Sequence, residues 1–169
     1  FVMVYVDADN FKAYNDYYSY EQGDEVIRLI SHLLTSFHDP QPEFIGHIGG
    51  DDFIVILNFH ADYAHFCNTL LTKFNQKIRS YYNQEDLDNN GIQTLNRDGQ
   101  KVTYGLISLS LGVLSVPPGV TAHQQKLASL ATQAKKKAKR AGGNTWALIQ
   151  ANKECAVMHS DDQTDHNPD

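Results

Sequence analysis

Residues 44–57 read FIGHIGGDDFIVIL, two apolar runs separated by Gly49, Gly50 and the pair Asp51 and Asp52. The apolar runs are typical of two short strands, and only the residues between them can make a tight reversal. The stretch therefore predicts a β-hairpin whose tip carries two carboxylates. Glycines lack side chains, so a bulky polyanion could approach the backbone at this tip. Taken alone, the tip is also compatible with an ordinary turn, because Gly and Asp are common in hairpin loops for conformational reasons.

A second acidic cluster follows the first apolar run of the chain. Residues 1–6 read FVMVYV, which is typical of a buried strand, and the run ends at Asp7, Ala8 and Asp9. If this strand lies beside the hairpin, Asp7 and Asp51 can converge on one hard cation. Mg²⁺ suits such a site best, because it takes one or two carboxylates together with waters and substrate phosphates. For either aspartate alone, an ordinary loop acid is the better interpretation.

Four motifs follow one another along the chain. They are DADNFKAYND at residues 7–16, GD at 23–24, GGDDF at 49–53 and AKRAGGN at 138–144. In this order they resemble the GGDEF domain of diguanylate cyclases, enzymes that condense two GTP molecules into cyclic di-GMP. The resemblance implies an α+β fold with a central, mostly antiparallel sheet flanked by helices, similar to the palm of nucleotide cyclases and its ferredoxin-like core.

The resemblance also implies roles for the residues that match the motifs. Metal binding is implied for Asp7, the backbone carbonyl of Ala8, and Asp51, with Mg²⁺ or Mn²⁺ as the ion. Asp51 and Asp52 are the implied catalytic residues, and either could be the base that activates the 3′-hydroxyl. The residues implied to bind the substrate are Phe11, Lys12, Asn15, Asp24 and Lys139.

Chemistry supports some of these roles and leaves alternatives for others. A carboxylate at Asp24 would accept from the N1 and N2 hydrogens of guanine, while the Asn15 amide can pair with its acceptors. The alternative for Asp24 is the N-cap of the following helix. Lys12 and Lys139 would neutralise phosphate oxygens, although a helix-surface lysine is usually only solvated. We interpret the run KKKAKR, residues 135–140, mostly as a solvated face with charge at a helix end.

The composition describes one globular domain. The chain has 169 residues, which is long enough to bury a core. Of these residues 41% are hydrophobic and 20% are charged, as is usual for a globular protein. Its formal net charge of -6 argues against a nucleic-acid partner. Two cysteines and no membrane-length apolar run favour a cytoplasmic domain without membrane contact. Because the chain begins directly at a strand, we expect it to be part of a larger protein with fused sensor or effector domains.

Hydrophobic periodicity and turn residues predict the remaining elements. A helix should follow the first strand, with Asp9 or Asn10 as its N-cap. Further along the chain, the expected elements are helices over residues 24–37 and 61–82, a polar connection over 83–90, a hairpin over 92–104, a strand over 106–116, a helix over 122–140 and a strand over 145–150. These elements make up one domain, residues 1–150. Residues 151–169 are polar, and we expect a disordered tail or linker.

One further motif resembles a calcium site. Residues 86–91, DLDNNG, copy the first half of an EF-hand loop, including the Gly that makes its sharp turn. The twelfth position, which should be a bidentate Glu, is Arg97, and this cation would repel calcium. A polar loop is therefore the better interpretation.

Four departures from the family pattern concern the site. Asp52 stands where Glu is usual, and Gly143 stands where an Arg is usual. Ser19 and Tyr20 replace a common Gly-His in the aromatic turn. The inhibitory product site of the family, Arg-x-x-Asp, falls on PQPE at residues 40–43, so we expect no product inhibition by that route.

Two functional hypotheses follow. The leading one is Mg²⁺-dependent condensation of two GTP to cyclic di-GMP and pyrophosphate, which requires a homodimer because each subunit holds one GTP. The alternative is a catalytically degenerate domain that binds GTP, or nothing, and regulates a fused module such as a cyclic di-GMP phosphodiesterase.

Overall fold

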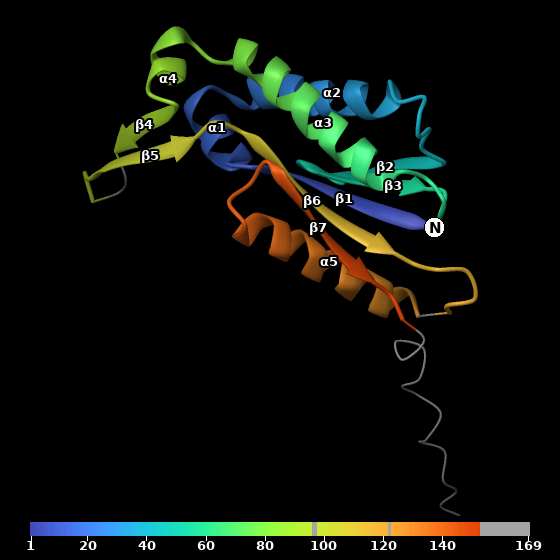
Figure 1. Ribbon diagram of the computed structural model, residues 1–169. Coiled ribbons are helices and arrows are strands. Elements are labelled where there is room, and N and C mark those ends of the chain that lie inside the picture. Colours follow the sequence, from blue (N-terminus) through green and yellow to red (C-terminus); the bar gives the residue numbers. More distant parts are fainter. Residues whose placement is uncertain (96–97, 122, 153–169) are drawn as a thin grey trace, which may run out of the picture.

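A computed structural model describes residues 1–95, 98–121 and 123–152 of the chain (Figure 1). The strands are β1 Val2–Asp9, β2 Phe44–Gly49, β3 Asp52–Leu57, β4 Gly91–Leu95, β5 Lys101–Gly105, β6 Ser108–Ser115 and β7 Thr145–Gln150. The helices are α1 Phe11–Tyr17, α2 Tyr20–Thr35, α3 Tyr63–Ile78, the 3₁₀ turn η1 Arg79–Tyr81, α4 Gln84–Asp88 and α5 Gln124–Arg140.

Strand β1 is the centre of a five-stranded sheet with the order β2-β3-β1-β6-β7. It pairs antiparallel with β3 on one side and with β6 on the other. Strands β2 and β3 form the predicted antiparallel hairpin, and only the β6–β7 pair of this sheet is parallel. The predicted α+β class with a mostly antiparallel sheet is therefore confirmed.

Helices cover both faces of this sheet. Figure 1 shows α2 and α3 on one face and α5 on the other. Side chains alternate between the two faces along a strand, so Val2, Val4 and Val6 of β1 are fully buried on the α2–α3 side. Met3 and Tyr5 pack instead with the cluster beneath α5. The same alternation directs the next odd-numbered side chain of β1, an aspartate, to the α5 side.

Three local features differ from the sequence-based expectations. Helix α2 begins at Tyr20, four residues before the predicted start, because the Ser19 side chain caps it by accepting a hydrogen bond from Gln22 N. Asn10 is at the N-cap position of α1, but it has φ 63° and its side chain makes no capping hydrogen bond. The expected connection over residues 83–90 contains the short helix α4, which Asn83 caps.

The end of the described chain remains part of the core. Ala151 is 1% exposed, and its backbone N–H donates to the Ser115 carbonyl at 2.8 Å. The predicted polar tail lies outside the described residues from position 153 onward, and the boundary at residue 150 stays a prediction. Among the described helices, none combines the length and the apolar character needed to cross a bilayer.

Helix α5 approaches the sheet closely at Gly112 of β6. A Cβ atom at this position would lie 2.4 Å from the backbone nitrogen of Lys135 and 2.8 Å from its Cα. We therefore expect Gly112→Ala to lower the free energy of unfolding by about 1–3 kcal/mol, because either the helix or the strand must shift. Urea unfolding monitored by circular dichroism measures this change.

Gly105→Ala provides the matched control. A Cβ atom at Gly105 would meet only the Asn10 side chain, at 3.5 Å, which is ordinary contact. The free energy of unfolding should then change by less than about 1 kcal/mol. Equal effects at the two glycines would contradict the close approach of α5.

Candidate active site

Three carboxylates meet at one end of the sheet. Val6 of β1 pairs with Phe53 of β3, so Asp7 of β1 and Asp52, the first residue of β3, lie side by side at this end of the β1–β3 pair. Asp51 is in the β2–β3 turn directly before Asp52. Asp7 is 5% exposed, whereas Asp51 and Asp52 are partly exposed. The structure thus brings together the two acidic segments that the sequence analysis singled out.

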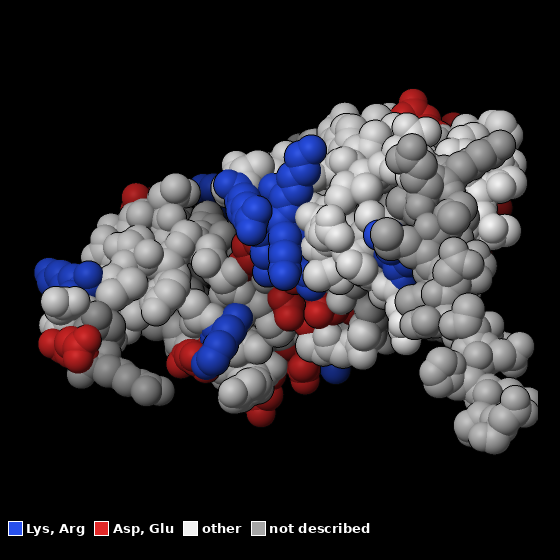
Figure 2. Space-filling view, turned by 90° about the horizontal axis from the view of Figure 1, so that it is seen from below, with Lys and Arg blue, Asp and Glu red and all other residues white. Residues whose placement is uncertain are grey.

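Two lysines of α5 face these carboxylates. Lys135 Nζ lies 3.1 Å from Asp7 Oδ1 and 3.1 Å from Asp52 Oδ1. Lys139 Nζ lies 2.5 Å from Asp7 Oδ2, although this oxygen receives no hydrogen bond of good geometry. Seen from below, Lys and Arg side chains form a stripe over the α5 face, directly beside a group of acidic side chains (Figure 2). The site therefore contains opposite charges in close contact.

These charges change the acid–base properties of the site. Burial raises the pKa of the Asp51 carboxyl above its ordinary value, and the negative charges of Asp7 and Asp52 raise it further. Burial alone would lower the pKa of Lys135, but its hydrogen bonds and charge interactions with Asp7 and Asp52 outweigh burial and raise it. Lys135 is therefore a stable cation at neutral pH, and the Asp51 carboxylate is more basic than an ordinary aspartate.

Lys135 is the site residue that the sequence analysis missed. We interpreted residues 135–140 mostly as a solvated face, and for Lys135 this interpretation is wrong, since its side chain is 18% exposed. A signal was available in the sequence: Lys135 and Lys139 are four residues apart, so they share one helix face. Lys136 and Lys137, between them, are exposed as expected.

A hollow of about 350 Å³ adjoins the acidic cluster and brings most of the predicted substrate-binding residues together. It is lined by Ala8, Asn10, Phe11, Lys12, Asn15, Asp16, Tyr20, Gly50, Asp51 and Lys139. Phe11 is buried, whereas the Lys12 side chain is 88% exposed and forms an ion pair with Asp16 at 2.6 Å. Asp24 does not line this hollow.

The predicted guanine-binding pair occupies two different helices. Asn15 Oδ1, on α1, is buried and has no hydrogen-bond partner. It packs directly on Gly23 of α2, where a Cβ atom would lie 1.8 Å from this oxygen. Asp24, the next residue, is exposed within α2. The alternative role of Asp24 as an N-cap is wrong, because Ser19 caps this helix.

The oxygen atoms of this site suit a hard cation that also keeps water or phosphate ligands. Within the described residues, no three His, Cys, Asp or Glu side chains are placed to enclose a metal ion. Two carboxylates and the Ala8 carbonyl are instead an incomplete set of oxygen ligands, which is the kind of set that Mg²⁺ accepts together with waters and phosphates. Asp7 Oδ2 is buried without a hydrogen bond and has the Lys139 ammonium as its ion partner, so a metal at this oxygen would replace that lysine.

Gly143, where the family pattern has Arg, is fitted closely into its surroundings. It has φ 78°, and a Cβ atom there would lie 2.5 Å from Ser108 Oγ and 2.9 Å from Asp9 Oδ2. The Asp9 carboxylate accepts hydrogen bonds from the Ser108 and Ser110 hydroxyls. An Arg at this position would therefore strain the backbone and disturb this hydrogen-bonded group.

The half-loop that resembles a calcium site has a structural role. Asp86 is buried, and its carboxylate accepts a hydrogen bond from the Tyr18 hydroxyl. The same hydroxyl accepts a hydrogen bond from Asn83 N. These contacts connect α4 to the turn between α1 and α2.

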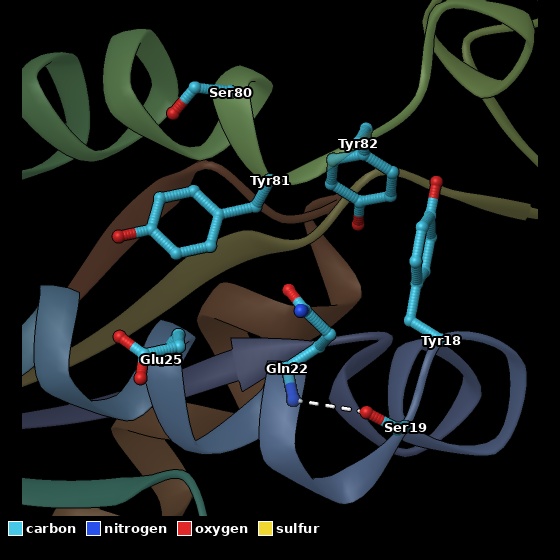
Figure 3. A pocket seen from close by; sticks show the side chains of 7 residues that line it. All are labelled: Tyr18, Ser19, Gln22, Glu25, Ser80, Tyr81 and Tyr82. Atoms are coloured by element: carbon cyan, nitrogen blue, oxygen red, sulfur yellow. Dashed lines mark hydrogen bonds between the residues drawn. The ribbon is translucent and has the colours of Figure 1, made fainter.

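A second hollow, of about 640 Å³, is larger but contains none of the predicted site residues. It is lined by Tyr18, Ser19, Gln22, Glu25, Ser80, Tyr81 and Tyr82. Figure 3 shows Gln22 and Glu25 of α2 facing the rings of Tyr81 and Tyr82 across it. Of these two hollows, the smaller one adjoins the converging charges and is the candidate site.

Comparison with known proteins agrees with this geometry. A family model described as "Diguanylate cyclase, GGDEF domain" matches residues 1–104, more than half of the chain. A diguanylate cyclase of Vibrio cholerae is 35% identical over 71 residues, which are 41% of this chain. This chain spans only 22% of the length of that relative.

Solved structures show the same fold. The GGEEF domain of a diguanylate cyclase from Vibrio cholerae superposes with a TM-score of 0.59 at 24% identity, covering 89% of this chain and 83% of that one. An EAL/GGDEF domain protein from M. capsulatus superposes with a TM-score of 0.55 at 25% identity, covering 87% and 83%. The match over residues 1–104 and the shared fold show that this chain belongs to the GGDEF domain family of diguanylate cyclases.

Proposed function

We propose that this domain binds GTP with Mg²⁺ or Mn²⁺ and condenses two GTP molecules to cyclic di-GMP. One observation supports this proposal above all: Asp7, Asp51 and Asp52 converge beside the hollow that contains Lys12, Asn15 and Lys139. Three carboxylates held together repel one another, and a bound divalent cation would relieve part of that repulsion. We place the domain in the cytoplasm, where GTP is available.

The metal would be held by Asp7, the Ala8 carbonyl and Asp51. When bound, it supplies Lewis-acid stabilisation of the charge that develops on the phosphate. Lys12 and Lys139 line the hollow and would neutralise the triphosphate. Asn15 would hold the guanine edge, and Asp24 would join it only if the base extends beyond the hollow along α2. Phe11 forms an apolar part of the wall.

The chemical step transfers a nucleotidyl group. The 3′-oxygen of one GTP attacks the α-phosphorus of the other, the bond to the β-phosphate oxygen breaks, and pyrophosphate leaves. The hydroxyl proton must go to a base, and Asp51 is the better candidate because its pKa is raised. Asp52 accepts a hydrogen bond from Lys135 instead. Repeating the step with the roles exchanged closes the ring.

One such site holds one GTP, so the reaction requires two subunits facing each other. Each subunit would bind one nucleotide and supply one base, and its partner would supply the second nucleotide. We therefore propose a homodimer as the active form.

A second candidate function is a degenerate regulatory domain. Both Lys135 and Lys139 already neutralise Asp7, and no arginine follows α5 at Gly143. Such a domain would control a fused module, and the M. capsulatus neighbour, an EAL/GGDEF domain protein, is an example of a GGDEF domain fused to another domain.

Incubation with GTP and Mg²⁺, followed by chromatography for cyclic di-GMP, distinguishes the two functions. The experiment uses both the purified domain and its parent chain, because a fused module could be needed for dimerisation. Product from either protein supports the enzyme. GTP binding without product from both supports the regulatory function.

Asp51→Ala should reduce cyclic di-GMP formation by about a hundredfold or more, because it removes a metal ligand and the better candidate base. The free energy of unfolding should change by less than about 1 kcal/mol, since Asp51 is a partly exposed turn residue. Initial rates and urea unfolding measure the two effects.

Asp88→Ala is the matched control for Asp51→Ala, because Asp88 is an exposed acid at the end of α4. It should leave the rate unchanged. An Asp51→Ala protein as active as this control would show that Asp51 is not part of the site.

Asp24→Ala tests the choice of base. If Asp24 accepts from the guanine donors, its loss should weaken GTP binding by about tenfold or more and leave the weak binding of ATP nearly unchanged. Isothermal titration calorimetry with both nucleotides measures this difference. Equal losses for GTP and ATP, or no loss for either, would remove Asp24 from the guanine site.

A further inference from the structure

Lys135 is held at the centre of the acidic cluster from three sides. Its ammonium nitrogen lies 3.1 Å from Asp7 Oδ1, 3.1 Å from Asp52 Oδ1 and 4.2 Å from the centroid of the Tyr5 ring. Tyr5 and Asp7 both come from β1 and point to the α5 side of the sheet. A cation between two carboxylates and over an aromatic face is favoured by each of these neighbours.

The position of this ammonium group is set by the backbone. The Lys135 backbone nitrogen lies directly over Gly112 of β6, where no side chain separates the helix from the strand. Most of the Lys135 side chain is therefore enclosed, unlike the exposed chains of Lys136 and Lys137. An exposed ion pair contributes little because both side chains lose freedom when they meet. Lys135 loses much of that freedom through packing, so its pairing with the acids is stronger.

The three carboxylates of this site require a cation even before any ligand binds. The charged groups facing Lys135 are Asp7 and Asp52, with Asp51 close enough to both acids to have its pKa raised by them. Lys139 pairs with Asp7 Oδ2, and its charge also acts on Asp51. Without Lys135, Asp52 would face Asp7 and Asp51 with no cation of its own within the described contacts.

We propose that Lys135 is the resident cation of this site: it bridges Asp7 and Asp52 in the metal-free domain, and a divalent metal binds Asp7 and Asp51 only after the Lys135 ammonium withdraws. The proposal rests on the metal-binding role proposed above for Asp7 and Asp51. The bridge formed by Lys135 would make the domain stable without metal and would weaken its affinity for a divalent ion. It also links metal to substrate, because the oxygens of a nucleotide triphosphate offer the withdrawn ammonium a new partner.

Lys135→Met tests the proposal, because Met retains the length and packing of the side chain but removes its charge. Mn²⁺ is the probe, and the electron paramagnetic resonance signal of the free ion gives its affinity without requiring activity. Lys136→Met is the matched control, since it removes the same charge from an exposed position on the same helix. We expect Lys135→Met to bind Mn²⁺ about tenfold more tightly than either the control or the wild-type protein.

Thermal unfolding gives a second, independent readout. In EDTA, Lys135→Met should melt at a lower temperature than Lys136→Met, because the three acids then repel one another. Addition of Mn²⁺ should raise its melting temperature more than it raises that of the control. Equal Mn²⁺ affinity in the two variants, or no Mn²⁺ binding by Lys135→Met, would overturn the proposal. So would equal melting temperatures in EDTA.

The outcomes separate this proposal from the proposed function. Cyclic di-GMP formation by the wild-type protein, with equal Mn²⁺ affinity in the two variants, would overturn the resident cation and leave the cyclase intact. Tighter Mn²⁺ binding by Lys135→Met, with no cyclic di-GMP from any protein, would support the resident cation and contradict the cyclase.

Discussion

The repulsion among Asp7, Asp51 and Asp52 is the constraint on which the functional end of this domain depends. Three carboxylates at the end of adjacent strands would disfavour the folded chain unless cations lie among them. Helix α5 supplies two, Lys135 and Lys139, within 3.1 Å and 2.5 Å of carboxylate oxygens. Folding of the sheet and docking of this helix are therefore coupled through charge as well as through apolar packing.

The close contact of α5 with the sheet has a consequence for the site. Gly112 allows the helix backbone to reach the strand, and this contact is at the same residue, Lys135, whose side chain extends to Asp7. A larger residue at position 112 would move the ammonium groups together with the helix. The packing at Gly112 in the middle of β6 thus determines, through helix α5, where the Lys135 ammonium lies relative to Asp7 at the end of β1.

The sequence was most informative where local pattern and topology agree. The hairpin over residues 44–57 and the strand over 145–150 follow from apolar runs and turn residues, whereas the mostly antiparallel sheet follows from the resemblance to the GGDEF domain. The structure confirms all three. The start of α2 was misplaced because Asp24 is a good N-cap residue, whereas Ser19 held that position after an aromatic turn. Lys135 was missed because a run of lysines is usually solvated, and only the docking of α5 shows which one turns inward. The roles of the site residues stay predictions.

The surroundings of Gly143 leave no room for an arginine side chain. Asp9, Ser108 and Ser110 form a hydrogen-bonded group in the space that a side chain at position 143 would enter. The two hydroxyls also satisfy the Asp9 carboxylate with hydrogen bonds. In the proposed function, positive charge toward the triphosphate would come from Lys139 of α5 and Lys12 of α1, which both line the hollow. If the domain binds GTP as proposed, the phosphates would compete with Asp7 for Lys139 and with Asp16 for Lys12, so the strength of these internal ion pairs would set how readily it accepts a nucleotide.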